Sequence, residues 1–269
     1  MCGPRNAPAN IISSPTMSKA PTERFTDRVD NYVRYRPGYP SEVLEALRHE
    51  CGLLPEHTVA DIASGTGIFT RLLLANGNRV FAVEPNAEMR AASALLKESF
   101  PNLTFVTGTA EETTLPAASV DFVTAAQAAH WFHPQQARTE FKRILKPGGW
   151  CVLLWNERLV SGTPFLEDYE KLLHTYCAEY KEKRHGKTGV IAQEFFGDDG
   201  YQERIFKYHQ QFDFAGLSGR LLSSSYCPLS GDPAHAPMMQ ELERIYQTHA
   251  RHNAVQIDYD TRVYFSQLK

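Results

Sequence analysis

The middle of the chain alternates short apolar runs with stretches in which apolar residues recur at spacings of three and four. The runs predict buried strands, and the spacing between them predicts amphipathic helices. Strands that alternate with helices form crossover connections, which produce a parallel sheet with helices on both faces. The pattern therefore predicts a doubly wound α/β fold. The five expected strands span residues 59–63, 79–84, 103–107, 120–125 and 150–155.

Helices are expected between these strands, each with one apolar face. The faces comprise Leu72, Leu73 and Leu74, then Met89, Ala92, Leu95 and Leu96, and then Phe141, Ile144 and Leu145. Gly77 marks the end of the first helix, and a Pro-Gly-Gly run at 147–149 stops the third. An earlier helix is expected after Ser41, a residue type that caps helix N-termini well.

The last third of the chain has a different pattern. Residues 206–214 and 255–265 alternate apolar and polar side chains, as long strands do. Helical stripes lie on either side of the first strand, one with Leu166, Tyr169 and Leu173, the other with Met238 and Leu242. About 40 residues separate the two strands, too many for a simple hairpin. We expect a helical cap above the sheet, built from residues 23–50, 160–200 and 215–254.

The N-terminal stretch differs from the rest in composition. Residues 1–22 carry four prolines among Gly, Ser, Asn and Thr, which predicts a disordered tail. Residues 23–269 are expected to form a single domain, whose core spans about 51–160. A segment rich in tyrosine and arginine, residues 25–40, leads into this domain.

Composition narrows the range of functions. The formal net charge of −3 provides no basic field for nucleic acid. Five cysteines, with no C-x-x-C pair, favour a reducing compartment and give no zinc site. His249 and His252 are one helical turn apart, but a third metal ligand is not evident, so no metal is expected. No apolar run reaches the roughly 20 residues that span a bilayer, so a soluble, cytoplasmic protein is predicted.

The sharpest motif follows the first expected strand, where Asp61 precedes the Gly65-Thr-Gly67 turn. Glycines at a strand-to-helix turn let the backbone approach a ligand closely, and the helix that follows offers N–H groups. Glu84 ends the second strand, where a carboxylate can accept the hydroxyls of a ribose. A nucleotide-like ligand is implied. The dinucleotide fingerprint would place glycine or alanine where the chain has Thr70, which disfavours an NAD(P)-dependent oxidoreductase.

At this point the sequence resembles the class I S-adenosylmethionine (AdoMet) dependent methyltransferases, in particular the small-molecule group with the ubiquinone-type and trans-aconitate-type enzymes. Five segments carry the resemblance: 60–67, 82–86, 108–116, 120–132 and 145–150. It implies a Rossmann-like, mostly parallel sheet of seven strands whose last strand is antiparallel. One departure is Ala63, where the family usually has glycine; we expect the turn to survive, with slightly less room beside the cofactor.

The resemblance also implies roles for individual residues. The methionine part of AdoMet would be held by Asp61, Ser64, Gly65, Thr66 and Gly67, with Gln127 beneath it. Glu84, followed by Pro85, would hold the ribose, and Ala110 with Glu111 the adenine. The predicted function is methyl transfer to an O, N or S atom of a small metabolite by a monomer or homodimer. Two alternatives stay open: the oxidoreductase, and a non-catalytic AdoMet-binding protein.

The sequence allows two hypotheses on how the methyl acceptor is activated. An arginine fork from the entry segment, at Arg34 or Arg36, would hold a carboxylate, which needs no base. A phenol, thiol or amine must lose a proton, and His130 beside Trp131 is the candidate base. The sequence favours the second hypothesis slightly, and the candidate catalytic residues are His130, Arg36 and Trp131.

Overall fold

The computed structural model describes residues 29–182 and 187–269, so the predicted disordered tail lies outside the described residues. Seven strands form one sheet in the order β3-β2-β1-β4-β5-β7-β6. β7 pairs antiparallel with both β5 and β6, and the other pairs are parallel, which confirms the predicted sheet. The strands are β1 Thr58–Ile62, β2 Arg79–Val83, β3 Leu103–Val106, β4 Val120–Ala126, β5 Leu145–Arg158, β6 Gln202–Phe212 and β7 Val255–Gln267.

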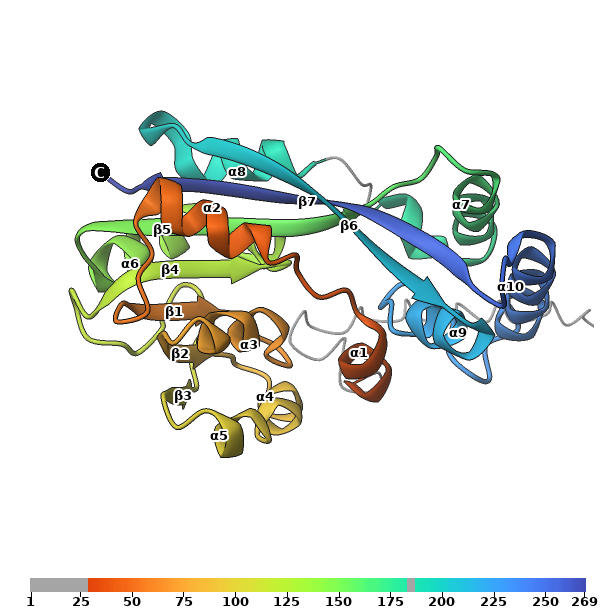
Figure 1. Cartoon of the computed structure of the whole chain (residues 1–269), viewed down its shortest axis with the longest axis horizontal. Coiled ribbons are helices and arrows are strands. Elements are labelled where there is room, and N and C mark those ends of the chain that lie inside the picture. The colour runs from red at the N-terminus through yellow and green to blue at the C-terminus, as the bar shows by residue number, and fades with distance from the viewer. Residues whose placement is uncertain (1–28, 183–186) are drawn as a thin grey trace, which may run out of the picture.

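Helices cover both faces of the sheet (Figure 1). On one face, α2 (Glu42–Cys51) and α3 (Ile68–Ala75) pack on the central strands in an apolar cluster. On the other face, α6 (Pro134–Ile144) and α8 (Thr188–Phe196) bury Phe141 and Phe195 against β4 and β5. Below the edge formed by β2 and β3 lie α4 (Ala87–Ser93) and α5 (Leu96–Ser99).

A third apolar cluster forms the cap at one end of the sheet. It joins α7 (Pro164–Tyr176), α9 (Phe214–Leu222) and α10 (His235–His249) to the outer ends of β6 and β7. A short 3-10 segment, Ala178–Glu182, follows α7, and another, Gly197–Asp199, lies between α8 and β6. The long strands carry this cap away from the parallel part of the sheet. α1 (Val29–Tyr35) lies between α4 and α9 and links the two parts.

The predicted extent of the cap was wrong in two places. α2 and α8 fall in the segments assigned to the cap, yet both pack on the sheet. Val43 and Leu47 of α2 are fully buried among sheet residues, as Ala192 and Phe196 of α8 are on the opposite face. An amphipathic stripe predicts a helix and a buried face, but it does not name the surface on which that face packs.

Some helices and strands also begin or end at other residues than expected, because neighbouring helices and strands compete for the same residues. The expected helix with Met89 and Leu95 is broken into α4 and α5, and Leu95 is 73% exposed. Leu145 begins β5 instead of ending α6, since its backbone pairs with Val120. Phe214 begins α9 instead of ending β6, because the Asp213 side chain accepts the backbone N–H of Gly216 and starts a helix.

Candidate functional site

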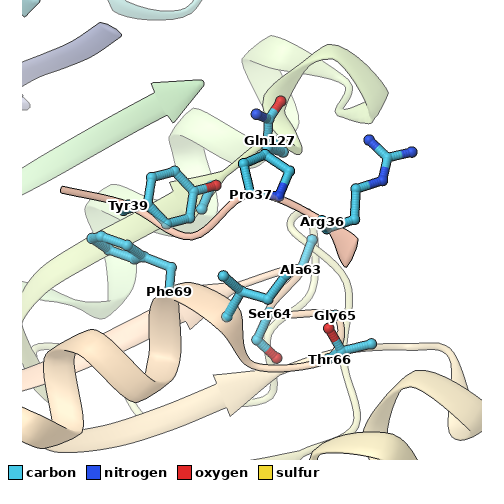
Figure 2. A pocket seen from close by; sticks show the side chains of 11 residues that line it. Arg36, Pro37, Tyr39, Ala63, Ser64, Gly65, Thr66, Phe69 and Gln127 are labelled. Atoms are coloured by element: carbon cyan, nitrogen blue, oxygen red, sulfur yellow. The ribbon is translucent and has the colours of Figure 1, made fainter. Parts of the chain in front are cut away.

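A small hollow opens where β1 and β4 end (Figure 2). Parallel sheets bind ligands at this edge, where the chain turns from one strand into the next helix. Four segments line the hollow: the turn after β1, the start of α3, the end of β4, and the chain between α1 and α2. The lining residues are Arg36, Pro37, Tyr39, Ala63, Ser64, Gly65, Thr66, Ile68, Phe69, Ala126 and Gln127.

The glycine turn is built as the motif requires. Gly65 has φ +57° and Gly67 has φ +80°, conformations that favour glycine. A Cβ on Gly67 would lie 2.6 Å from Leu96 Cδ1, so this glycine also permits the close packing of α5. The backbone N–H of Gly67 donates to the carbonyl of Ser64 over 2.9 Å and closes the turn. The turn thus presents its backbone and the start of α3 to the hollow.

Glu84 fixes this turn from the neighbouring strand. Its carboxylate accepts the backbone N–H of Gly65 and that of Asn86, each at 2.9 Å. The side chain is buried, and this burial raises the pKa of Glu84 although the two N–H groups oppose the shift. A carboxylate has about four lone-pair sites, so these two bonds leave part of its capacity unused, but Glu84 itself is not among the residues that line the hollow. Pro85 follows and leads into the Asn86 cap of α4.

Asp61 lies beneath the turn and is not among the residues that line the hollow. Its carboxylate accepts the hydroxyls of Thr70, at 2.6 Å, and Thr124, at 2.8 Å. Burial raises the pKa of Asp61 to about 6. These bonds connect β1, α3 and β4, so the geometry gives Asp61 a positioning role. Thr70, which departs from the dinucleotide fingerprint, is thereby part of the turn's support.

Two polar residues at the hollow have unusual features, one in its side chain and the other in its backbone. Thr66 Oγ1 is buried and has no hydrogen-bond partner among the residues that the structure describes. Gln127 has φ +58°, a conformation that is uncommon for residues other than glycine. Its side-chain amide donates to the carbonyl of Asn156 at 3.2 Å. Unsatisfied polar atoms and left-handed backbone are features that gather at ligand sites.

Ala63 also lines the hollow, and its φ of +52° shows why glycine is common at this position. The turn forms as expected, but alanine is strained there by roughly 1–2 kcal/mol. We expect Ala63→Gly to raise the free energy of unfolding by up to about 1 kcal/mol, after the added entropy of the unfolded chain is deducted. Urea denaturation measures this change. Ala91→Gly, within α4, is the control and should lower stability by about 1 kcal/mol. A loss of stability in the Ala63 variant would contradict the strain.

The two predicted adenine contacts lie elsewhere. Ala110 is buried in the cluster beneath α6. Glu111 accepts the backbone N–H of His133 at 2.9 Å, beside the start of α6, and lines a second, open hollow with Gln135 and Thr139. The structure therefore does not bring Ala110 and Glu111 into the first hollow, and their contact with adenine stays a prediction.

The candidate acceptor residues from β4 lie just beyond Gln127. His130 and Trp131 form a short 3-10 segment, Ala129–Trp131, with ring centroids 4.8 Å apart. Trp155 Nε1 donates to His130 Nδ1 over 3.4 Å. With Nδ1 accepting, a neutral His130 ring carries its proton on Nε2, which then donates. A base role would require Nδ1 to leave Trp155, so it stays a prediction.

The wall of the hollow contains Arg36, which the sequence predicted as a site residue, and two aromatic residues, which it did not predict. Arg36 lines the hollow and donates from Nη2 to the carbonyl of Ser223 at 2.9 Å. Tyr39 and Phe69 were not predicted, yet their rings meet edge to face at 5.1 Å on the wall of the hollow. The aromatic composition of the entry segment was the available signal for Tyr39. The sequence pattern around Phe69 indicates only a core residue of α3.

Comparisons with known proteins agree with this geometry. A family model described as a methyltransferase domain matches residues 60–153, from β1 to β5. An uncharacterized methyltransferase of Schizosaccharomyces pombe is 29% identical over 88% of this chain and 92% of its own length. An uncharacterized methyltransferase of Mycobacterium tuberculosis is 40% identical, over 50% of this chain and 52% of its own length.

Solved structures share the fold. One from Anaeromyxobacter dehalogenans, whose name describes a type II methyltransferase, superposes with a TM-score of 0.61 at 18% identity. The superposition covers 87% of this chain and 98% of that chain. In the described parts of the chain, no helix is both long and apolar enough to cross a bilayer. The sequence matches and the shared fold together support a class I methyltransferase.

Proposed function

We propose that this chain transfers a methyl group from AdoMet to a small-molecule acceptor. One observation carries the proposal: the glycine turn, clamped by the Glu84 carboxylate, borders a hollow into which Thr66 brings an unpartnered buried hydroxyl. These features fit AdoMet, because its ribose hydroxyls and amino-acid group need carboxylate, hydroxyl and backbone partners. AdoMet supplies a methyl group already activated on a sulfonium.

The chain's own residues bind and orient this donor. Glu84 has lone pairs left for the ribose hydroxyls after its two backbone bonds. Thr66 and the backbone of the turn offer hydrogen bonds to the polar end of the donor. The rings of Tyr39 and Phe69 exclude water along one wall. Methyl transfer needs mainly an aligned nucleophile and a dry site, so such positioning accounts for most of the catalysis.

The acceptor side of the site is assigned to the entry segment and to the segment after β4. Arg36 lines the hollow, while His130 and Trp131 follow its Gln127 wall. In this proposal Arg36 and Trp131 orient the acceptor. His130 holds or removes a proton if the acceptor carries one. The acceptor is a small metabolite, since the net charge of −3 offers nothing to attract nucleic acid.

Isothermal titration with AdoMet and, separately, with NAD tests the donor. We expect saturable binding of AdoMet at one site per chain and no heat from NAD. Labelled AdoMet added to a mixture of metabolites should then yield products that carry the label. Binding of NAD in place of AdoMet would overturn the proposal in favour of the oxidoreductase. Tight AdoMet binding without any labelled product would favour a non-catalytic binding protein.

A further inference from the structure

Two buried cysteines meet inside the cap. Cys177 follows the last residue of α7, and Cys227 lies in the loop between α9 and α10, 50 residues further along the chain. Both residues are present as thiols, and their Sγ atoms are 3.3 Å apart. The two sulfurs of a disulfide lie about 2.05 Å apart, so a bond between these two requires them to approach by roughly 1.3 Å.

The other two cysteines that the structure describes are separated from each other by the sheet. Cys51 belongs to the apolar cluster beneath α2, and Cys151 belongs to the cluster on the opposite face. Burial raises the pKa of both thiols above the ordinary value, which keeps them protonated and unreactive. Among the four described cysteines, Cys177 and Cys227 are therefore the pair placed for a bond.

The backbone on both sides of the pair can supply the small movement. Cys177 is the C-cap of α7, with φ −107° and ψ 89°, so it already lies outside the regular helix. Cys227 lies in a turn, where its N–H donates to the carbonyl of Ser224 at 3.1 Å. Neither residue belongs to a strand, so a shift at either one disturbs no strand pairing.

The pair is buried but lies beneath short connecting segments. The side chain of Cys177 is 0% exposed and that of Cys227 is 3% exposed. Ala178 and Glu179, directly after the first cysteine, are exposed, as are residues 229–233 after the second. Local opening of connecting segments costs less free energy than opening of the core, so a small oxidant gains access to these sulfurs.

The segment that holds Cys227 also supports the hollow. The carbonyl of Ser223 accepts a hydrogen bond from Arg36, which lines the hollow. Ser224 follows, and its carbonyl accepts the N–H of Cys227. A covalent bond from Cys227 to the end of α7 therefore restrains the segment on which the Arg36 side chain rests.

We propose that Cys177 and Cys227 are a redox pair, which hydrogen peroxide converts into a disulfide that stabilises the cap. One cysteine loses its thiol proton and attacks a peroxide oxygen; the O–O bond breaks, and the leaving hydroxide takes that proton as water. The other sulfur then attacks the resulting sulfenic acid, whose S–O bond breaks, and a second water leaves with the remaining thiol proton. Two thiols are oxidised, and one peroxide is reduced to two waters.

The first test maps the bond in protein that carries Cys2→Ser, because Cys2 lies outside the described residues and is a further thiol. After treatment with hydrogen peroxide, remaining thiols are blocked and the unreduced protein is digested with trypsin. Peptides 172–181 and 221–244 should be joined, with a mass about 2 Da below their sum. Dithiothreitol should separate them again, because thiols reverse a disulfide by exchange.

Two results of this map overturn the proposal. In one, the two peptides stay separate, either unmodified or with a gain of about 16 Da for each added oxygen. In the other, the cysteines are joined to Cys51 or Cys151 instead of to each other. The map needs no substitution in the cap, so it decides the pairing even if a cap variant does not fold.

The second test compares the melting temperatures of the oxidised and the dithiothreitol-treated protein. The oxidised protein should melt several degrees higher, because the disulfide closes a loop of 50 residues in the unfolded chain. Cys177→Ala and Cys227→Ala should each abolish this difference, whereas Cys51→Ala, which removes a buried thiol outside the pair, should retain it.

An oxidised protein that melts at the same or a lower temperature than the reduced protein would overturn the stabilising role, and so would a difference that persists in the Cys177 and Cys227 variants. Neither test uses AdoMet or a methyl acceptor. The inference about the cysteine pair and the proposed methyl transfer can therefore fail independently of each other.

Discussion

Glu84→Ala should weaken AdoMet binding by about 1.5–3 kcal/mol, which is roughly a 10- to 150-fold increase in Kd. The loss has two physical parts. The ribose hydroxyls lose a charged acceptor, and the backbone N–H groups of Gly65 and Asn86 lose the oxygens that position the turn. Because two N–H groups are left unsatisfied, the variant should also melt at a lower temperature than the unmodified protein.

Two variants separate these contributions in isothermal titration. Glu84→Gln keeps one carbonyl oxygen as an acceptor but loses the charge, so its Kd should lie between those of the alanine variant and the unmodified protein. Glu88→Ala removes an exposed carboxylate from the first turn of α4 and should leave Kd unchanged. A Glu84→Ala protein that binds AdoMet as tightly as the unmodified protein would remove Glu84 from the donor site.

Asp61 should make the protein less stable as pH rises through about 6. Burial raises its pKa from 3.8 to about 6, so the folded state binds the proton more tightly than the unfolded chain does. Stability from this group is therefore fully present below about pH 4 and is lost as pH rises through 6. The predicted change is on the order of 3 kcal/mol in the free energy of unfolding between pH 4 and pH 8.

Urea denaturation across this pH range, with Asp61→Asn as the reference, isolates the effect. The variant should gain stability relative to the unmodified protein as pH rises, because its amide cannot ionise. Asp121→Asn is the control of opposite sign. Although burial opposes it, the Lys146 ammonium keeps the pKa of Asp121 below its usual value, so the stabilisation from Asp121 is lost as pH falls. A pH-independent difference between Asp61→Asn and the unmodified protein would contradict the raised pKa.

The sequence alone predicts the sheet and the turn that borders the proposed donor site. Buried parallel strands are continuous apolar runs, and helices of this fold carry apolar stripes, so both leave local patterns. The turn at Gly65 and Gly67 was equally visible, because only glycine readily adopts the backbone that both residues have. Glu84 could be placed beside this turn because neighbouring parallel strands end at the same edge of the sheet.

Only the folded structure shows on which surfaces these helices pack and which side chains pair. It placed α2 and α8 on the sheet, Tyr39 against Phe69, and Glu111 beside His133 instead of in the hollow. It also gave Arg158 a carboxylate partner and brought the Sγ atoms of Cys177 and Cys227 together. Such pairings join residues far apart in the chain. They depend on how side chains fill space and pair their charges after the helices and strands have packed. The periodicity of the sequence does not predict these pairings.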